Sequence, residues 1–258
     1  MEVHHHSHKP KNWKEYITEF VMLFTAVTLG FFAENLREHQ IVENHKIQNL
    51  TAMINDLKQD SIEIDNRIAE NTDAMKRFEH MKDISFAYHH NQVNENYVID
   101  SIVSTYINTT WDIGLFINNA SYKNTIASGS LSYIKNNETK QLIAQYYEAL
   151  YSKLLVNNKV LDEDASEFMG KTFAFGFMTI SNGYTMNTDK KMNWQTRSNY
   201  EQIEDFKSIP AFRKIILAPE FRMSVNKIEG RCGYYLYVMQ LAKEFNNKLL
   251  AQLNKREY

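Results

Sequence analysis

The chain has 258 residues, of which 29 are basic and 31 are acidic, so its formal net charge is −2. This balance gives no reason to expect a nucleic acid as partner, because nucleic-acid-binding proteins concentrate a basic excess. Only 8 Gly and 3 Pro are present, which is too few for the many turns of a β-sandwich or barrel. The single cysteine, Cys232, excludes an internal disulfide bond and a multi-cysteine metal site. The composition therefore predicts an all-α protein.

The first predicted element is a membrane-spanning helix near the N-terminus. Residues 20–33 contain no charge, but such a helix rises only about 21 Å, less than the ~30 Å hydrocarbon core of a bilayer. Trp13 and Tyr16 extend the apolar stretch backwards, and both residue types favour the membrane–water interface. Counted from residue 13 to residue 32, the segment has 20 residues, which is long enough to cross. We therefore predict a transmembrane helix at residues 15–34, preceded by a short His- and Lys-rich tail at residues 1–14.

The residues expected at the membrane, or at a helix–helix interface within it, are Trp13, Tyr16, Phe20, Ala26, Gly30, Phe31 and Phe32. Ala26 and Gly30 form a small-xxx-small pair, which is a weak signal of helix association. A cleaved signal peptide is the alternative to a retained helix. Cleavage after Ala33 would place the bulky Phe31 at the −3 position, which favours a small residue. Thr28 and Gly30 would fit cleavage better, but the two phenylalanines that follow favour retention.

Basic residues predict the orientation of this helix. Three lysines precede it, whereas the basic residues that follow it are interleaved with glutamates. Because the positive-inside rule places the more basic flank in the cytoplasm, we expect a cytoplasmic N-terminus and residues 34–258 on the other side of the membrane. The basic residues are Lys9, Lys11 and Lys14 before the helix, and Arg37 and Lys46 after it.

Residues 35–84 carry a heptad pattern and are predicted to form a long helical stalk. Apolar residues recur at alternating steps of three and four, with polar Ser61 and Asn71 as the interruptions. Such a seam indicates either a coiled coil between subunits or a long helix docked on its own bundle, and polar seam residues suit both. The charged residues between seam positions, such as Asp56, Asp60 and Glu63, are expected to face solvent. The seam consists of Ile47, Leu50, Ile54, Leu57, Ile64, Ile68, Met75 and Phe78.

Residues 85–258 are predicted to form an extracytoplasmic helical bundle. Loops are expected at 85–95 and 181–207, where apolar periodicity is lost. Because glycine favours a helix end and proline a first turn, helices are expected at 97–107, from about 120 to Gly129, from Glu138 onward, from Pro210 to 217, and from Pro219 onward. The apolar stretches 173–180 and 234–242 are too short to cross a bilayer and are expected in the core.

No arrangement of side chains predicts catalysis or a cofactor. Four histidines are weak metal-ligand candidates, because imidazole binds Zn, Cu and Ni, but a short polar tail offers no second shell to fix them. These are His4, His5, His6 and His8. The acidic pair Glu163 and Glu167 lacks the Glu-x-x-His motif of a di-iron bundle, so a solvated face is expected there. Cys232 is expected to be buried and inert. We therefore predict no enzyme, no cofactor and no catalytic residue.

Two stretches carry a more specific pattern. In residues 9–39, Trp-Lys-Glu-Tyr enters the apolar stretch and Ala-Glu-Asn-Leu-Arg-Glu leaves it, after a His-rich leader. Residues 120–136 contain Ala-Ser-Gly-Ser and Ile-Lys-Asn, and Tyr146-Tyr147 follows. Both stretches resemble a family of uncharacterised single-pass membrane proteins of Gram-negative bacteria. The resemblance implies one anchor and a helical extracytoplasmic domain, so we expect the anchor in the inner membrane and the domain in the periplasm. It implies no activity and no catalytic residues.

The leading functional hypothesis is protein–protein contact, as an accessory or scaffold subunit of an inner-membrane assembly or as a homo-oligomer. The expected partners are membrane lipid and either another membrane protein or a second copy of the chain. A ligand-sensing module that signals through a partner is a second hypothesis, since 15 Tyr and 15 Phe could line a pocket between helices. A metal-dependent enzyme is a third, and it rests only on the acidic helix positions.

Overall fold

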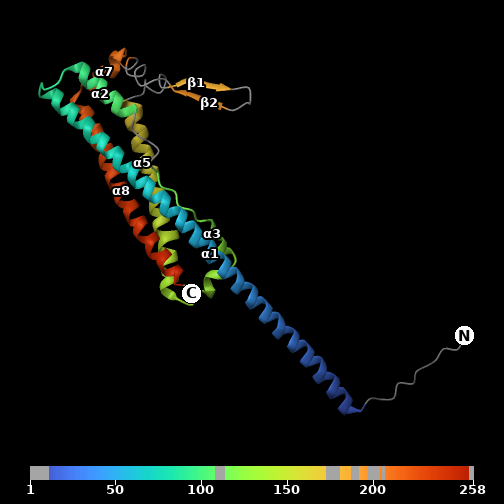
Figure 1. The fold of residues 1–258 in the computed structure, drawn as a ribbon. Helices are drawn as coiled ribbons and strands as arrows, with labels where there is room; N and C mark the ends of the chain where they lie inside the picture. The colour runs from blue at the N-terminus through green and yellow to red at the C-terminus, as the bar shows by residue number, and fades with distance from the viewer. Residues whose placement is uncertain are drawn as a thin grey trace.

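The computed structural model describes residues 12–107, 114–172, 204 and 207–255, together with the backbone of two strands. Figure 1 shows a long rod, in which helix α1 (Trp13–His89) extends at its N-terminal end far beyond the other helices. Its 77 residues correspond to about 115 Å of helix. Gly30 is its only glycine and it contains no proline, so no residue type that breaks helices interrupts it.

The other described helices lie along α1 from His39 onward. They are α2 (Glu95–Ile107), α3 (Ala120–Ala127), the 3₁₀ helix η1 (Ser130–Tyr133), α4 (Asn137–Ala144), the π-helix η2 (Gln145–Leu150), α5 (Tyr151–Thr172), α7 (Pro210–Ile216) and α8 (Pro219–Asn254). α8 runs antiparallel to α1, since its end contacts Leu57 and its beginning contacts Lys82. The predicted helical bundle is therefore confirmed, with both prolines at helix starts and Gly129 at φ 68° after α3.

Two predicted loops differ from the structure. The loop expected at 85–95 begins later, because α1 continues to His89 and buries Ile84 and Ser85 on the way. The turn comes at Asn91, which has a φ of 58°. The loop expected at 181–207 contains an antiparallel pair of short strands, β1 (Ser181–Met186) and β2 (Met192–Thr196). Tyr184 stands opposite Trp194 there, and aromatic residues favour strands. The stretch 173–180 lies outside the described residues.

The residues of the predicted seam form two rows along α1, with a spacing of seven residues within each row, and only one of these rows is buried. Leu50, Leu57, Ile64 and Phe78 are buried, with Asn71 in the same row, whereas Ile47 is about half exposed. Ile54, Ile68 and Met75 lie only partly buried at the edge of the core. The second buried row is instead Met53, Asp60, Ala74 and Met81. The buried face of α1 is thus rotated relative to the predicted seam. The reason is that α8 covers one side of α1, while α3 and η1 cover another side. Within the described part of the chain, the stalk therefore docks on its own bundle.

Candidate functional site

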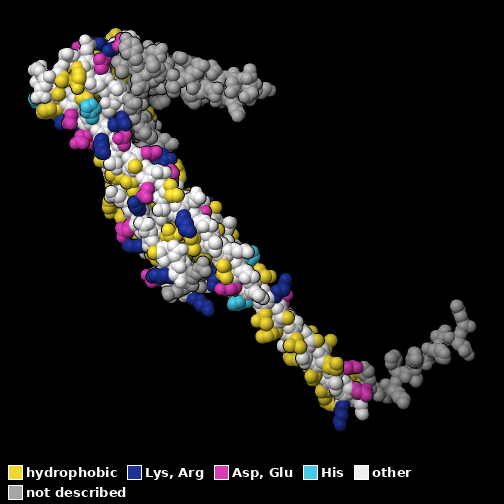
Figure 2. All heavy atoms as spheres, in the orientation of Figure 1, with side chains coloured by type: hydrophobic (Ala, Val, Ile, Leu, Met, Phe, Trp, Pro, Cys, Tyr) yellow, Lys and Arg dark blue, Asp and Glu magenta, His cyan; other side chains and the backbone are white. Residues whose placement is uncertain are grey.

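The N-terminal part of α1 stands clear of the bundle. Every residue from Asn12 to Ile41 is exposed, and Figure 2 shows hydrophobic side chains around this end of the rod. An 18-residue window in it has a mean hydropathy of 1.7, and none of that window is buried. The core helix of a soluble protein would hide such a surface. α1 is thus long and apolar enough to cross a membrane. Residues 13–33 are called the apolar segment below.

The predicted membrane residues all lie exposed on α1: Trp13, Tyr16, Phe20, Ala26, Gly30, Phe31 and Phe32. No atom lies within 4 Å of the position that a Cβ would take at Gly30, so the small-residue face is open. The hydroxyls of Thr25 and Thr28 donate to the carbonyls of Val21 and Phe24, each at 2.7 Å. These bonds satisfy the two hydroxyls within the helix, as an apolar surrounding requires.

A buried polar network joins α1 to the rest of the bundle at Asp60. Its carboxylate accepts hydrogen bonds from the backbone N–H of Asn118 and the hydroxyl of Tyr146, both at 2.9 Å. The Asn246 amide of α8 donates to the Tyr146 oxygen at 3.1 Å and to the Leu57 carbonyl at 2.9 Å. Asp60 is only 4% exposed. Burial raises the pKa of its carboxyl to about 6, although the hydrogen bonds from Asn118 and Tyr146 oppose the shift.

One turn earlier on α1, Asp56 holds the start of α3. Its carboxylate accepts from the backbone N–H of Ser121 at 3.3 Å, from the Ser121 hydroxyl, and from the side-chain amide of Asn118 at 3.1 Å. The first N–H groups of a helix have no partner inside the helix, and a carboxylate there is favourable. Asp56 and Asp60 together therefore fix the first turn of α3 against α1.

The tyrosines of η2 reach this network because the helix widens into a π-turn. Tyr146 contacts Asp60, while the ring of Tyr147 stacks on that of Tyr122 in α3, with centroids 4.8 Å apart and planes at 5°. The Tyr122 hydroxyl donates to Glu148, and burial together with this carboxylate raises the pKa of Tyr122 to about 12. Adjacent residues of a regular α-helix point in different directions. The π-turn lets three consecutive residues contact α1 or α3.

The expectation that Asp60 faces solvent is wrong, and Asp56 is only partly exposed. Asp60 lies in a heptad row with the buried residues Met53, Ala74 and Met81 and with the partly exposed Arg67. Because this row mixes charged and apolar residues, the sequence offers little local signal that Asp60 is buried. Its hydrogen-bond donors, Asn118 and Tyr146, lie on two later segments of the chain, so no local pattern reveals that the carboxylate is buried. Asp60 can hold a proton, and it is shielded from solvent by the packed bundle.

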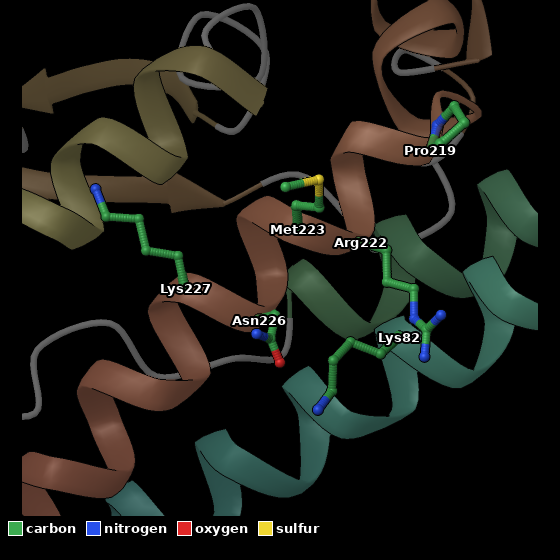
Figure 3. A pocket seen from close by; sticks show the side chains of 6 residues that line it. All are labelled: Lys82, Pro219, Arg222, Met223, Asn226 and Lys227. Atoms are coloured by element: carbon green, nitrogen blue, oxygen red, sulfur yellow. The ribbon is translucent and has the colours of Figure 1, made fainter.

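A shallow hollow of about 510 Å³ lies at the other end of the rod, where α8 begins beside the last turns of α1. Its lining residues, drawn in Figure 3, are Lys82, Pro219, Arg222, Met223, Asn226 and Lys227. Lys82 pairs with Glu229, and Lys227 pairs with Glu167 at 2.6 Å. Figure 3 shows Lys227 pointing away from Lys82 and Arg222. The three cations therefore do not converge on one point.

The surface of α8 carries an exposed aromatic pair. The rings of Tyr234 and Tyr237 lie 6.4 Å apart, and the Lys153 ammonium of α5 lies 5.7 Å from the centroid of the Tyr237 ring. About half of each tyrosine is exposed, whereas Tyr235 and Met239 beside them are fully buried. The stretch 234–242, expected in the core, is therefore amphipathic.

The other candidates from the sequence lie apart from these features. Glu163 and Glu167 each pair with lysines, and Lys171 and Lys227 lower the pKa of Glu167 to about 2. Cys232 is buried as predicted, and burial raises the pKa of its thiol to about 12. The described residues contain no group of three or more His, Cys, Asp or Glu side chains that could hold a metal. His4, His5, His6 and His8 lie outside the described residues.

Fold and surface together define a mainly α-helical protein with one candidate membrane-spanning helix that continues into a helical bundle. The chain belongs to a family of unknown function, DUF6090, whose model matches residues 19–193. The matched range contains most of the apolar segment, the Asp56 and Asp60 network except for Asn246, and α5. It confirms the resemblance to an uncharacterised family. No curated protein and no solved structure matches the chain.

Proposed function

We propose that this protein is a single-pass protein of a bacterial inner membrane, with its N-terminus in the cytoplasm and its helical bundle in the periplasm. It acts there by protein–protein contact, as an accessory or scaffold subunit of a membrane assembly or as a homo-oligomer. The observation that carries the proposal is the apolar segment, which is exposed along its whole length and continuous with the bundle. Such a surface needs a membrane to cover it.

The exposed tyrosines of α8 support the part of the proposal that concerns a partner. Tyrosine is enriched where proteins bind each other, because it contributes a large contact area and a hydroxyl at little entropic cost. Tyr234 and Tyr237 are adjacent on a long, well-supported helix, with a cation from α5 beside them. We expect the partner to cover this surface.

The test is a mild-detergent pull-down of the full chain from native membranes, followed by mass spectrometry and native mass measurement. A stoichiometric second protein would make the chain an accessory subunit, and a defined self-assembly would make it a homo-oligomer. The double substitution Tyr234→Ser and Tyr237→Ser should abolish either association. Tyr97→Ser is the matched control, because Tyr97 is an equally exposed aromatic residue on α2. A monomer with no partner would overturn the proposal.

Cysteine labelling tests the orientation. A Ser7→Cys variant should resist an impermeant thiol reagent in intact cells, whereas Gln92→Cys, in the turn after α1, should react. Cys232 is buried and adds little background. Labelling of Ser7→Cys but not of Gln92→Cys would show that the orientation is the opposite of the one proposed.

A further inference from the structure

One part of the bundle reaches toward the apolar segment. Residues 131–138, which run from η1 into the first turn of α4, are called the membrane-proximal tip here and lie beside α1. The preceding serines Ser128 and Ser130 accept from the side-chain amide of Asn49 at 3.0 and 3.4 Å. The ring of Tyr133 then meets the ring of His39, with centroids 5.8 Å apart. The chain therefore descends along α1 from Asn49 to His39 before α4 turns back.

Helix geometry gives the height of the tip above a membrane. The proposed span ends at residue 34, and His39 lies five residues farther along the same uninterrupted helix. Five residues rise about 7.5 Å. The polar layer on each side of the hydrocarbon core is on the order of 5–8 Å thick. Tyr133, at the level of His39, therefore lies at the height of the lipid headgroups.

The side chains at this level suit that layer. Leu36 is 57% exposed and lies three residues before His39, which puts it on the helix face that meets Tyr133. Tyr133 is 36% exposed, and Lys135 is exposed as well. Tyrosine favours the membrane–water interface, and lysine can keep its ammonium among phosphates while its stem lies along apolar groups.

From this arrangement we infer that the membrane-proximal tip docks in the phospholipid headgroup layer of the bilayer that the apolar segment crosses. Leu36 contacts the boundary of the acyl chains there, the Tyr133 ring lies among the headgroups, and Lys135 lies against lipid phosphates. The inference rests on the proposed membrane span. A second contact of this kind fixes the rotation of the rod about α1, which a single helix in a membrane leaves free.

The experiment uses the full chain in phosphatidylcholine–phosphatidylglycerol vesicles that contain lipids with a nitroxide quencher at either the headgroup or the acyl chain. An environment-sensitive fluorophore is attached to a cysteine at one of three positions. Leu23→Cys reports on the middle of the span, Ser132→Cys on the tip, and Gln92→Cys on the distal turn. We expect acyl-chain quenching at Leu23, headgroup quenching at Ser132, and neither at Gln92.

The other outcomes distinguish a failure of the tip docking from a failure of the proposed membrane span. If Leu23 is quenched while Ser132 behaves like Gln92, the span stands and the docking of the tip is wrong. If Leu23 is not quenched, the span is wrong and the inference falls with it. In the Ser132→Cys protein, Tyr133→Ser with Lys135→Glu should reduce headgroup quenching, and Lys159→Glu, a change at an exposed lysine of α5, should leave it unchanged. Equal quenching in both variants would overturn the role of Tyr133 and Lys135.

Discussion

Replacing Asp60 with asparagine should remove most of the pH dependence of the protein's stability between pH 5 and pH 7.5. The pKa of the Asp60 carboxyl is about 6 in the folded protein because the group is buried, against an ordinary value of 3.8. The folded state therefore holds this proton more tightly than the unfolded chain does. The stabilising contribution is complete below pH 3.8 and is lost as the pH rises through 6.

The size of the effect follows from the difference between the two pKa values. It corresponds to about 3 kcal/mol of folding free energy in total. About 1.4 kcal/mol of this is lost between pH 5 and pH 7.5. Glu167 has its pKa lowered to about 2, so its opposite contribution changes below this window.

The measurement is urea unfolding of the full chain in detergent micelles, followed by circular dichroism at several pH values from 5 to 7.5. The unaltered protein should lose stability as the pH rises, and the Asp60→Asn protein should not. Asp65→Asn is the control, because this carboxylate pairs with Lys243 at 2.6 Å on the surface and its loss leaves Asp60 in place. A slope that persists in the Asp60→Asn protein would refute the reasoning.

Four further substitutions test the packing of the bundle by the same unfolding measurement. Tyr146→Phe removes the hydroxyl that donates to Asp60 and should lower the free energy of unfolding by about 1–3 kcal/mol. Because that hydrogen bond holds the pKa of Asp60 down, its loss should also move the midpoint of the pH dependence upward. Leu57→Ala should cost about 2–5 kcal/mol, since Leu57 is fully buried, whereas Ile47→Ala should cost no more than about 1 kcal/mol; equal costs would contradict the docked stalk. Gly129→Ala should destabilise by about 1–2 kcal/mol because the residue has a φ of 68°, and an unchanged stability would contradict that backbone conformation.

The helices of the bundle were largely predictable from the sequence because their boundaries depend on local chemistry. Pro210 and Pro219 begin helices and Gly129 follows one, as their fixed or permissive backbone angles favour. The end of α1 was not predictable in the same way. Ile84 and Ser85 are held helical by burial against the bundle, and tertiary packing of this kind outweighs a local loss of periodicity.

The buried network was the least predictable part. Periodicity identifies the buried row that contains Leu57 and Ile64. Which of the two neighbouring rows of α1 is buried with it depends on where the other helices lie. Asp60 lies in that second row, and its charge alone favours solvent. Its two donors, the Asn118 backbone N–H and the Tyr146 hydroxyl, come from distant parts of the chain. Tyr146 is placed by a π-turn, which arises from tertiary contacts as much as from local sequence.

The stretch that carries the family resemblance has a physical reason for its small polar residues. From Ser121 to Tyr133 the chain follows one face of α1, with contacts first at Asp56, then at Asn49 and finally at His39. Ser121, Ser128 and Ser130 each come close to α1 and form a hydrogen bond with it, which a larger apolar residue could not do. From Asp60 to His39, α1 rises about 30 Å without interruption. Residues 118–133 therefore connect the buried carboxylate network to the tip for which we propose a contact with lipid, and both keep a fixed height and rotation relative to the apolar segment.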